Sequence, residues 1–214
     1  MDAPPHAPSP AAPEAEILGQ ETVHQGRFPK QVVRFRFRRF DGGMSRTLTW
    51  EVWRRGEAAA LLPYDPVADR VVLIEQFRLP ALLAGLVPRL LEVPAGLLDD
   101  DSAEACARRE TEEEAGLAVG RIEQLGLYLL TPGGSDERIH MFAGQVKAPP
   151  TDADGIAGHF GLPEESEDIR VRVFDAADAI AAAFDGRVTN ATTAIALAWL
   201  GLHRDRLRRE WNSA

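Results

Sequence analysis

The sequence has a single cysteine, no long apolar run and fewer basic than acidic residues. Each shortage excludes a class of protein. With only Cys106 among its 214 residues, the chain cannot form an intramolecular disulfide or a cysteine-rich zinc site. No stretch of about 18 apolar residues occurs, so we expect no membrane span. The 24 Lys and Arg residues against 33 Asp and Glu residues give a net charge of -9. This charge argues against nucleic acid as the main partner, because phosphate backbones are bound by basic patches.

The N-terminal segment lacks the features of a secretion signal. Residues 1–15 read MDAPPHAPSPAAPEA, with neither a basic flank nor a continuous apolar run. This Pro- and Ala-rich composition cannot bury enough apolar surface to fold, so we predict a disordered tail. Together with the single cysteine, these features predict a cytoplasmic enzyme.

The segment after the tail predicts a small antiparallel sheet. Apolar residues alternate with polar ones at 31–40 and 46–53, and Asp41-Gly42-Gly43 between them is a typical hairpin turn. A two-stranded ribbon is not stable alone and needs a surface to pack on. We therefore predict an N-terminal β ribbon over residues 16–54, with a role in dimerisation, followed by one domain over residues 55–214.

Strand-like and helix-like patterns alternate along this larger domain. Residues 147–167 are predicted to form a long loop, a feature that is usually functional or disordered in a compact domain. Cys106 lies within a helical pattern and is expected in the core. Strands are predicted at 58–65, 70–78, 121–130, 138–146 and 169–174, and helices at 99–116, 176–184 and 190–211; residues 90–96 form a short apolar run that ends in glycine. This order predicts an α/β fold, a mixed sheet with helices on its faces in an α/β/α sandwich.

The helix predicted near residues 99–116 carries an unusual set of carboxylates. Glu110, Glu113 and Glu114 are three and four residues apart, so they share one helix face, where like charges are mutually destabilising. Arg109 can pair with Glu113, which leaves the other two uncompensated. Such a cluster beside a glycine-containing loop suits a hard cation such as Mg²⁺ or Mn²⁺. The alternative is a solvated acidic helix face, as is common in acidic proteins.

The sequence around these glutamates resembles the Nudix box. Residues 109–117 match its core, Arg-Glu-U-x-Glu-Glu-x-Gly-U, where U is aliphatic, except that Thr111 takes an aliphatic position. Gly96 and Asp101 stand near the front of the box. Four residues separate them where the family has five, and Asp101 replaces a glutamate. These departures concern the loop before the helix and leave its metal-binding carboxylates in place.

The resemblance extends from about Phe28 to Trp211 and is greatest to the ADP-ribose pyrophosphatases of the Nudix family. It includes residues 61–78, and Pro132-Gly133-Gly134 followed by Glu137-Arg138. It implies hydrolysis of the ADP-ribose pyrophosphate to AMP and ribose 5-phosphate with Mg²⁺ or Mn²⁺. It also implies a homodimer whose subunits exchange their N-terminal ribbons.

Individual roles follow from the same resemblance. Glu110, Glu114 and the carbonyl of Ala95 should bind metal, with Glu113 beside them as a further ligand or catalytic group. The resemblance assigns the remaining catalytic and substrate roles as follows. Arg78 should contact the diphosphate, Glu165 should position or deprotonate the attacking water, with Glu167 as the alternative, and Glu137 should lie near the metal or the terminal ribose.

Aromatic residues of the predicted ribbon suit a nucleobase. Phe28 aligns with an adenine-stacking aromatic of the family, and Trp50 could cover the base from the partner subunit. Simpler interpretations stay open: Trp50 as ribbon core, Arg78 as a strand-end charge, residues 164–168 as a solvated loop and Glu137-Arg138 as an ion pair.

Two other functions also stay open. The same chemistry could act on another nucleoside diphosphate sugar, such as GDP-mannose or a UDP-sugar, or on a dinucleotide. Alternatively, a domain of this kind could bind a nucleotide without hydrolysing it. The intact carboxylates at 110, 113 and 114 favour an enzyme.

Overall fold

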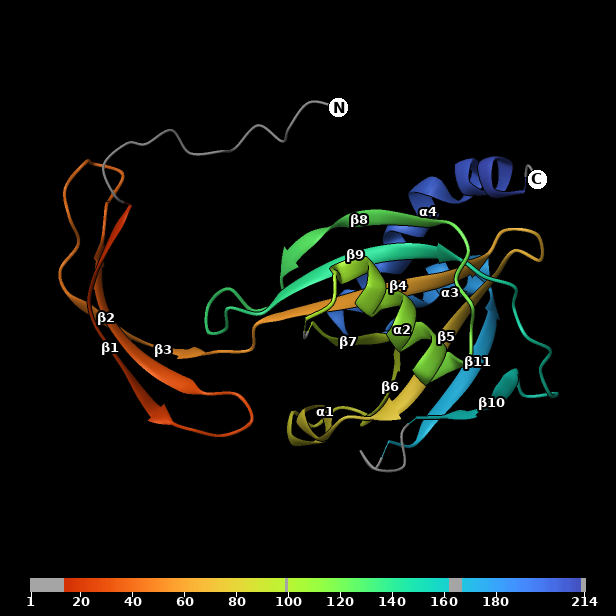
Figure 1. Cartoon of the computed structure of the whole chain (residues 1–214), viewed down its shortest axis with the longest axis horizontal. Coiled ribbons are helices and arrows are strands. Elements are labelled where there is room, and N and C mark those ends of the chain that lie inside the picture. Colours follow the sequence, from red (N-terminus) through yellow and green to blue (C-terminus); the bar gives the residue numbers. More distant parts are fainter. Residues whose placement is uncertain (1–13, 99, 162–166, 213–214) are drawn as a thin grey trace. The chain divides into compact units, whose positions relative to one another are not determined.

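The computed structural model describes residues 14–98, 100–161 and 167–212, which form two compact units (Figure 1). Unit 1 contains the chain up to Arg55 together with Thr131–Asp136, and unit 2 contains Gly56–Leu130 and the chain from Glu137 onward. Residues 1–13 of the predicted tail lie outside the described residues. Among the described residues, no helix is both long and apolar enough to cross a membrane.

Unit 1 is built on a three-stranded antiparallel sheet. Its strands β1 (Ala15–His24), β2 (Lys30–Phe37) and β3 (Leu48–Trp53) lie in that order. The β2–β3 pairing confirms the predicted hairpin, and the intervening turn uses Gly42 with a φ of 86°. The sequence reasoning missed β1. Its residues are nearly all exposed, so it lacks the alternation that marks a half-buried strand.

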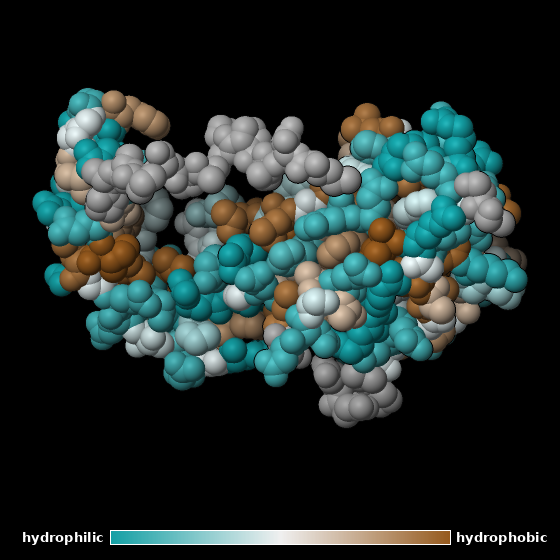
Figure 2. All heavy atoms as spheres, turned by 45° about the horizontal axis from the view of Figure 1, so that its top comes forward, coloured by the Kyte–Doolittle hydropathy of each residue, from teal (hydrophilic) through white to brown (hydrophobic). Residues whose placement is uncertain are grey.

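One face of this sheet is apolar. The register places Val33 opposite Trp50 and Phe35 opposite both Leu48 and Ile17. Trp50 is 52% exposed and Ile17 is 60% exposed. Figure 2 shows hydrophobic side chains at the surface of this unit, at the left of the view. The sheet therefore leaves part of an apolar surface in contact with solvent.

Unit 2 contains an eight-stranded mixed sheet in the order β10-β11-β5-β4-β9-β8, with β6 paired to β5 and β7 paired to β4. The central β4 and β9 are parallel, and the other neighbouring pairs are antiparallel. The strands are β4 (Glu57–Asp65), β5 (Arg70–Phe77), β6 (Arg89–Glu92), β7 (Ala95–Leu97), β8 (Ile122–Leu129), β9 (Arg138–Gln145), β10 (Ile156–Phe160) and β11 (Ile169–Asp175).

Helices cover both faces of this sheet, which confirms the α/β/α sandwich. Ala59 and Leu61 of β4 pack with Cys106 of α2 (Ala103–Ala115) on one face. On the other face, Leu62 packs in a cluster with Leu197 and α3 (Ala176–Ala182) and α4 (Ala191–Trp211). A short helix, α1 (Leu79–Leu83), follows β5. Because β4 is buried on both faces, its apolar residues run without alternation.

One local prediction needs correction, and one segment without a predicted structure is now assigned. The loop predicted over 147–167 contains β10, a short edge strand held by pairing with β11. The short apolar run at 90–96 forms parts of two strands, β6 and β7, which pair with different partners on either side of Pro94.

Candidate functional site

The predicted carboxylate helix is α2, and local signals set both of its ends. Ser102 accepts a hydrogen bond from the Ala105 N–H at 3.2 Å, which caps the start of the helix. Gly116 ends it in the left-handed conformation with a φ of 66°. Thr111 is fully buried, and its hydroxyl donates to the carbonyl of Ala107 at 2.7 Å. A hydroxyl therefore fits where the related box has an aliphatic group, because its hydrogen bond is made within the helix.

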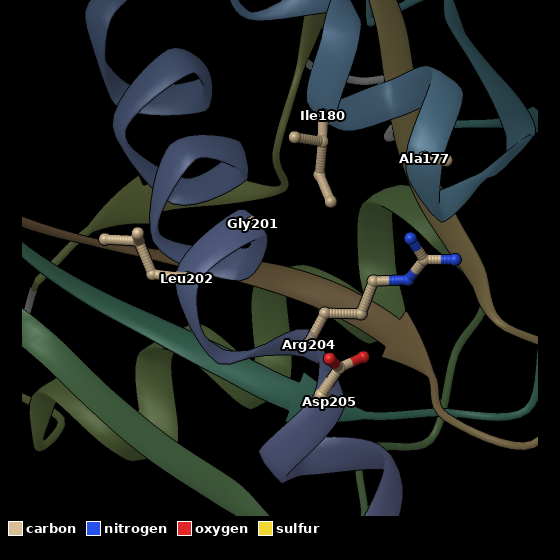
Figure 3. Close-up of a pocket in the computed structure, with 6 residues that line it drawn as sticks. All are labelled: Ala177, Ile180, Gly201, Leu202, Arg204 and Asp205. Carbon is tan, nitrogen blue, oxygen red and sulfur yellow. The ribbon is translucent and has the colours of Figure 1, made fainter.

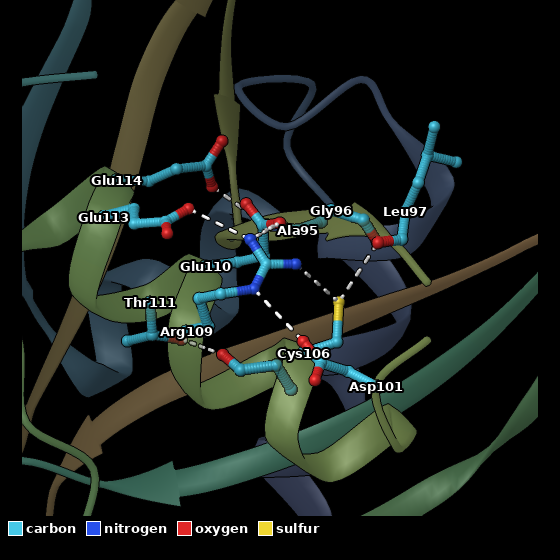
Figure 4. A network of polar contacts seen from close by, with 11 residues as sticks. Ala95, Gly96, Leu97, Asp101, Cys106, Arg109, Glu110, Thr111, Glu113 and Glu114 are labelled. Atoms are coloured by element: carbon cyan, nitrogen blue, oxygen red, sulfur yellow. Dashed lines mark hydrogen bonds and ion pairs between the residues drawn. The ribbon is translucent and has the colours of Figure 1, made fainter. Parts of the chain in front are cut away.

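Glu114 joins this helix to β7. Its side chain lies inside the domain, with only 4% of the residue exposed. One carboxylate oxygen accepts a hydrogen bond from the Ala95 N–H at 2.9 Å (Figure 4). The same residue therefore fixes the backbone of Ala95, whose carbonyl the sequence predicts to bind metal.

Glu110 lies one helical turn before Glu114 and packs over Gly96. A Cβ added to Gly96 would lie 1.9 Å from Oε1 of Glu110 and 2.0 Å from its Cδ. Only glycine leaves room for the carboxylate at this point of β7. The glycine at the front of the box is thus explained by close approach of a side chain, and its φ is not in the left-handed range.

Arg109 connects the remaining acidic groups. Its Nη1 lies 2.8 Å from Glu110 and 3.1 Å from Glu113, and its Nε lies 3.4 Å from Asp101 (Figure 4). The pairing with Glu113 was expected from the i, i+4 spacing, whereas that with Glu110 was not. Asp101 therefore ties the shortened loop to the helix through Arg109.

Burial makes the carboxylates of Glu110 and Glu114 hard to ionise without a cation. It raises the pKa of Glu114 to about 8, and the charges of Glu110 and Glu167 act in the same direction. Burial also raises the pKa of Glu110, against the opposing charge of Arg109 and with support from Glu113. Glu110 and Glu114, which with the adjacent Ala95 we call the carboxylate edge of α2, thus lie where water solvates a negative charge poorly.

The donor set fits a hard divalent cation. Carboxylate oxygens and a backbone carbonyl are the ligands that Mg²⁺ and Mn²⁺ prefer, and desolvated carboxylates gain most from a bound cation. Within the described part of the chain, however, no three acidic, His or Cys side chains converge as a formed metal site. Glu110 and Glu113 instead contact Arg109, and Glu114 contacts the Ala95 backbone.

Arg78 lies at the end of β5, where Glu92 of β6 holds it. Nε and Nη2 of Arg78 donate to Oε2 of Glu92 at 3.0 and 2.7 Å. Burial alone would lower the pKa of Arg78, but Glu92, Glu114 and Glu167 raise it. The guanidinium is therefore within electrostatic range of the carboxylate edge, as a diphosphate-binding group would need to be. Sequence reasoning did not identify Glu92, because its role depends on strand pairing.

The acidic loop is described in part. Glu165, the predicted water-activating residue, lies outside the described residues. Its alternative, Glu167, is described, and its charge contributes to the raised pKa of Glu110, Glu114 and Arg78. The end of this loop therefore lies within electrostatic range of the edge. Glu137 directly precedes β9, which begins at Arg138.

The predicted base-binding aromatics belong to unit 1. Phe28 contacts Trp53 edge to face at 6.1 Å, and the guanidinium of Arg55 lies 4.1 Å from the Phe28 ring centre. Trp50 packs edge to face on Phe35 at 5.2 Å while staying half exposed. Trp53 ends β3 and Arg55 follows two residues later; the sequence reasoning named neither of them.

A separate hollow lies between α3 and α4. Its volume is about 350 Å³, and Figure 3 shows its lining residues: Ala177, Ile180, Gly201, Leu202, Arg204 and Asp205. Arg204 is already bound to Asp69, with Nε 2.9 Å from the carboxylate. Because α3 and α4 cover the sheet face opposite α2, this hollow is not part of the carboxylate edge.

Comparison with known proteins finds a matching family model and similar enzymes. A family model described as the NUDIX domain matches residues 54–192. An ADP-ribose pyrophosphatase of Escherichia coli (strain K12) is 45% identical over 199 residues, which cover 92% of this chain and 93% of that protein. An ADP-ribose pyrophosphatase of Haemophilus influenzae is 37% identical over 202 residues, covering 92% and 91% respectively.

Two further matches are a relative that covers less of the chain and a solved structure with lower sequence identity. A GDP-mannose pyrophosphatase of Pectobacterium atrosepticum is 38% identical over 164 residues, covering 76% of this chain and 81% of that protein. A crystal structure of an ADP compounds hydrolase shares the fold, with a TM-score of 0.63 and 23% identity. The match covers 92% of this chain and 100% of that one.

Proposed function

Because the chain belongs to the NUDIX domain family, we propose that it is a metal-dependent hydrolase that cleaves the pyrophosphate of ADP-ribose to AMP and ribose 5-phosphate. The observation that carries this proposal is the α2 edge, where Glu114 is 4% exposed and packs against the backbone of Ala95. The Escherichia coli relative supports ADP-ribose as the substrate, since the match spans nearly the whole of both chains.

The buried carboxylates are better suited to binding a cation than to stabilising the fold. A carboxyl whose pKa is about 8 in the metal-free protein destabilises the folded state when it is ionised. Neutral or apolar residues would serve a purely structural edge better. We propose that Glu110, Glu114 and the Ala95 carbonyl hold Mg²⁺ or Mn²⁺, with Glu113 beside them. A divalent ion bound there supplies charge neutralisation for the diphosphate and activation of the attacking water.

The protein's own groups then orient the diphosphate and the water. Arg78 donates hydrogen bonds to non-bridging oxygens, whose negative charge grows as the P–O bond breaks. A glutamate of the acidic loop, either Glu165 or Glu167, accepts the proton of the attacking water. The attacked phosphorus gains the water oxygen, and the bridging oxygen leaves with the other phosphate, which is that of ribose 5-phosphate or of AMP depending on which phosphorus is attacked.

We further propose a homodimer formed through residues 16–54. Its support is the apolar face of the unit 1 sheet, which leaves Trp50 and Ile17 more than half exposed. Phe28 and Trp50 would then bind the adenine base, and Glu137 would lie on the ribose side. The buried thiol of Cys106 is consistent with a cytoplasmic setting, where it stays reduced.

A substrate panel tests the proposed reaction. Catalytic efficiency would be measured with Mg²⁺ and with Mn²⁺ on ADP-ribose, GDP-mannose, a UDP-sugar and a dinucleotide. ADP-ribose should be preferred and should yield AMP. A higher efficiency on GDP-mannose would replace the substrate while keeping the chemistry, whereas absence of hydrolysis would overturn the proposal.

Two variants of α2 are compared in this assay, one at the proposed metal site and one as its matched control. Glu114→Gln should lower kcat by about 100-fold or more, because removing one ligand of a catalytic metal forfeits several kcal/mol. Glu112→Gln removes a charge from the same helix at an exposed position and should keep full activity. Equal activity of the two variants would contradict the proposed role of the edge.

A further inference from the structure

Glu92, the hydrogen-bond partner of Arg78, is also part of the candidate site. Glu92 is 14% exposed at its side chain, and a single oxygen, Oε2, accepts from three donors. Two are Nε and Nη2 of Arg78 at 3.0 and 2.7 Å, and the third is Nε2 of Gln76 at 3.1 Å. Gln76 lies near the end of β5 and Arg78 directly follows that strand, so Glu92 fixes this strand end from β6.

The backbone of Glu92 is held from the other side of the strand by α4. The Val93 N–H donates to the hydroxyl of Thr193 at 3.0 Å, and the side chain of Asn190 donates to the carbonyl of Leu91 at 2.7 Å. Asn190 also caps α4 through the Thr193 N–H at 2.9 Å. The residues before and after Glu92 are thus fixed independently of Arg78, and Glu92 can act as a rigid support.

The contact geometry also leaves part of Arg78 available. A guanidinium has five N–H donors, and Glu92 engages the edge formed by Nε and Nη2. No hydrogen bond to Nη1 is found among the described residues, and 44% of the side chain is exposed. Pre-organising one edge of an arginine lowers the entropy lost when the other edge binds a phosphate.

From this geometry we infer that Glu92 is a positioning residue for Arg78: it holds one edge of the guanidinium so that the other edge meets the diphosphate. The inference rests on the proposed function, because it takes the diphosphate as the ligand of Arg78. Glu92 itself does not touch the substrate. Its effect on turnover should therefore pass entirely through Arg78.

A double-mutant cycle tests this dependence directly. Arg78→Ala should lower kcat/KM by about 100-fold, the usual effect of losing one transition-state donor. Glu92→Gln should lower it by about 10-fold, in the same kinetic parameter, because a loosened donor is misplaced but not lost. The double variant should match Arg78→Ala alone.

The chain offers a closely matched control. Glu75 lies on β5, has 17% side-chain exposure and pairs with Arg170 at 3.2 Å. Glu75 belongs to the same pair of strands as Glu92 but faces the other side of the sheet. Glu92 is paired with Ile74 and so shares its face, whereas Glu75, the next residue along β5, points to the opposite face. Glu75→Gln should keep wild-type kinetics, and Glu92→Asp covers the case in which Glu92→Gln does not fold.

Each outcome bears on the inference. Multiplied effects in the double variant, wild-type kinetics of Glu92→Gln, or an unaffected Arg78→Ala would each overturn it. Calorimetry with an ADP-ribose analogue that has a methylene bridge between the phosphorus atoms measures binding without hydrolysis. It therefore distinguishes failure of the positioning role from failure of the proposed function. If the wild type binds this analogue more tightly than either single variant but hydrolyses nothing, the positioning role stands and the proposed reaction fails. If the variants bind it as tightly as the wild type does, the positioning role fails.

Discussion

Replacing Glu114 by glutamine should make the metal-free protein more stable at high pH. Burial raises the pKa of Glu114 from 4.5 to about 8 in the folded chain. A carboxyl with a raised pKa binds more protons when folded than when unfolded. The free energy of unfolding therefore falls as the pH rises from about 4.5 to about 8. The stability contributed by the protonated form is lost across that range.

The size of the effect follows from the same pKa. A tenfold change in proton affinity corresponds to about 1.4 kcal/mol, so full ionisation of Glu114 destabilises the fold by at most about 5 kcal/mol. Glutamine cannot ionise and keeps an oxygen for the Ala95 N–H. We expect Glu114→Gln to exceed the wild type by roughly 2 to 4 kcal/mol at pH 9 and by less than about 1 kcal/mol at pH 5.

Urea unfolding followed by tryptophan fluorescence, in EDTA at pH 5, 7 and 9, measures this difference. Glu112→Gln, at an exposed position of the same helix, should follow the wild type at every pH. Saturating Mn²⁺ should stabilise the wild type and leave Glu114→Gln nearly unchanged. A wild-type stability that is flat from pH 5 to pH 9, or a less stable Glu114→Gln at pH 9, would refute the reasoning.

Three further changes should have distinct effects. Gly96→Ala places a Cβ 1.9 Å from the Glu110 carboxylate, so kcat/KM should fall about 100-fold while the circular dichroism spectrum is kept; retained activity would contradict the close packing. Thr193→Val removes the acceptor of the Val93 N–H and should lower the free energy of unfolding by about 1 to 3 kcal/mol in urea titrations. An unchanged urea midpoint would argue against a stabilising hydrogen bond between Thr193 and Val93. Gly116→Ala should destabilise by at least about 1 kcal/mol, because its φ is 66° and Phe160 lies 2.5 Å from the added Cβ; a neutral effect on the melting temperature would contradict this.

Local signals in the sequence were sufficient to predict α2. Ser102 and Gly116 cap it, and the spacing of Glu110 and Glu114 places both on one face. The edge strands β1 and β10 could not be predicted in the same way. They are held by backbone pairing with one neighbour, and their exposed side chains carry no alternation of apolar and polar residues.

The candidate site, like the fold, could be predicted from the sequence only in part. The spacing predicted that Glu110, Glu113 and Glu114 share one helix face, but not that Glu114 is buried, because its hydrogen-bond partner Ala95 belongs to β7, outside the helix. Glu92 was missed for a related reason, since its contact with Arg78 depends on the register of β5 and β6. A residue whose role is fixed by strand pairing leaves no periodic signal in its own segment.

The most direct test of the central claim is a crystal structure with Mn²⁺ and the methylene-bridged ADP-ribose analogue, in which anomalous scattering locates the ion. The account predicts Mn²⁺ bound to Glu110, Glu114 and the carbonyl of Ala95, with the diphosphate on its open side. An ion bound elsewhere, with Glu114 still hydrogen-bonded only to the Ala95 backbone, would contradict it.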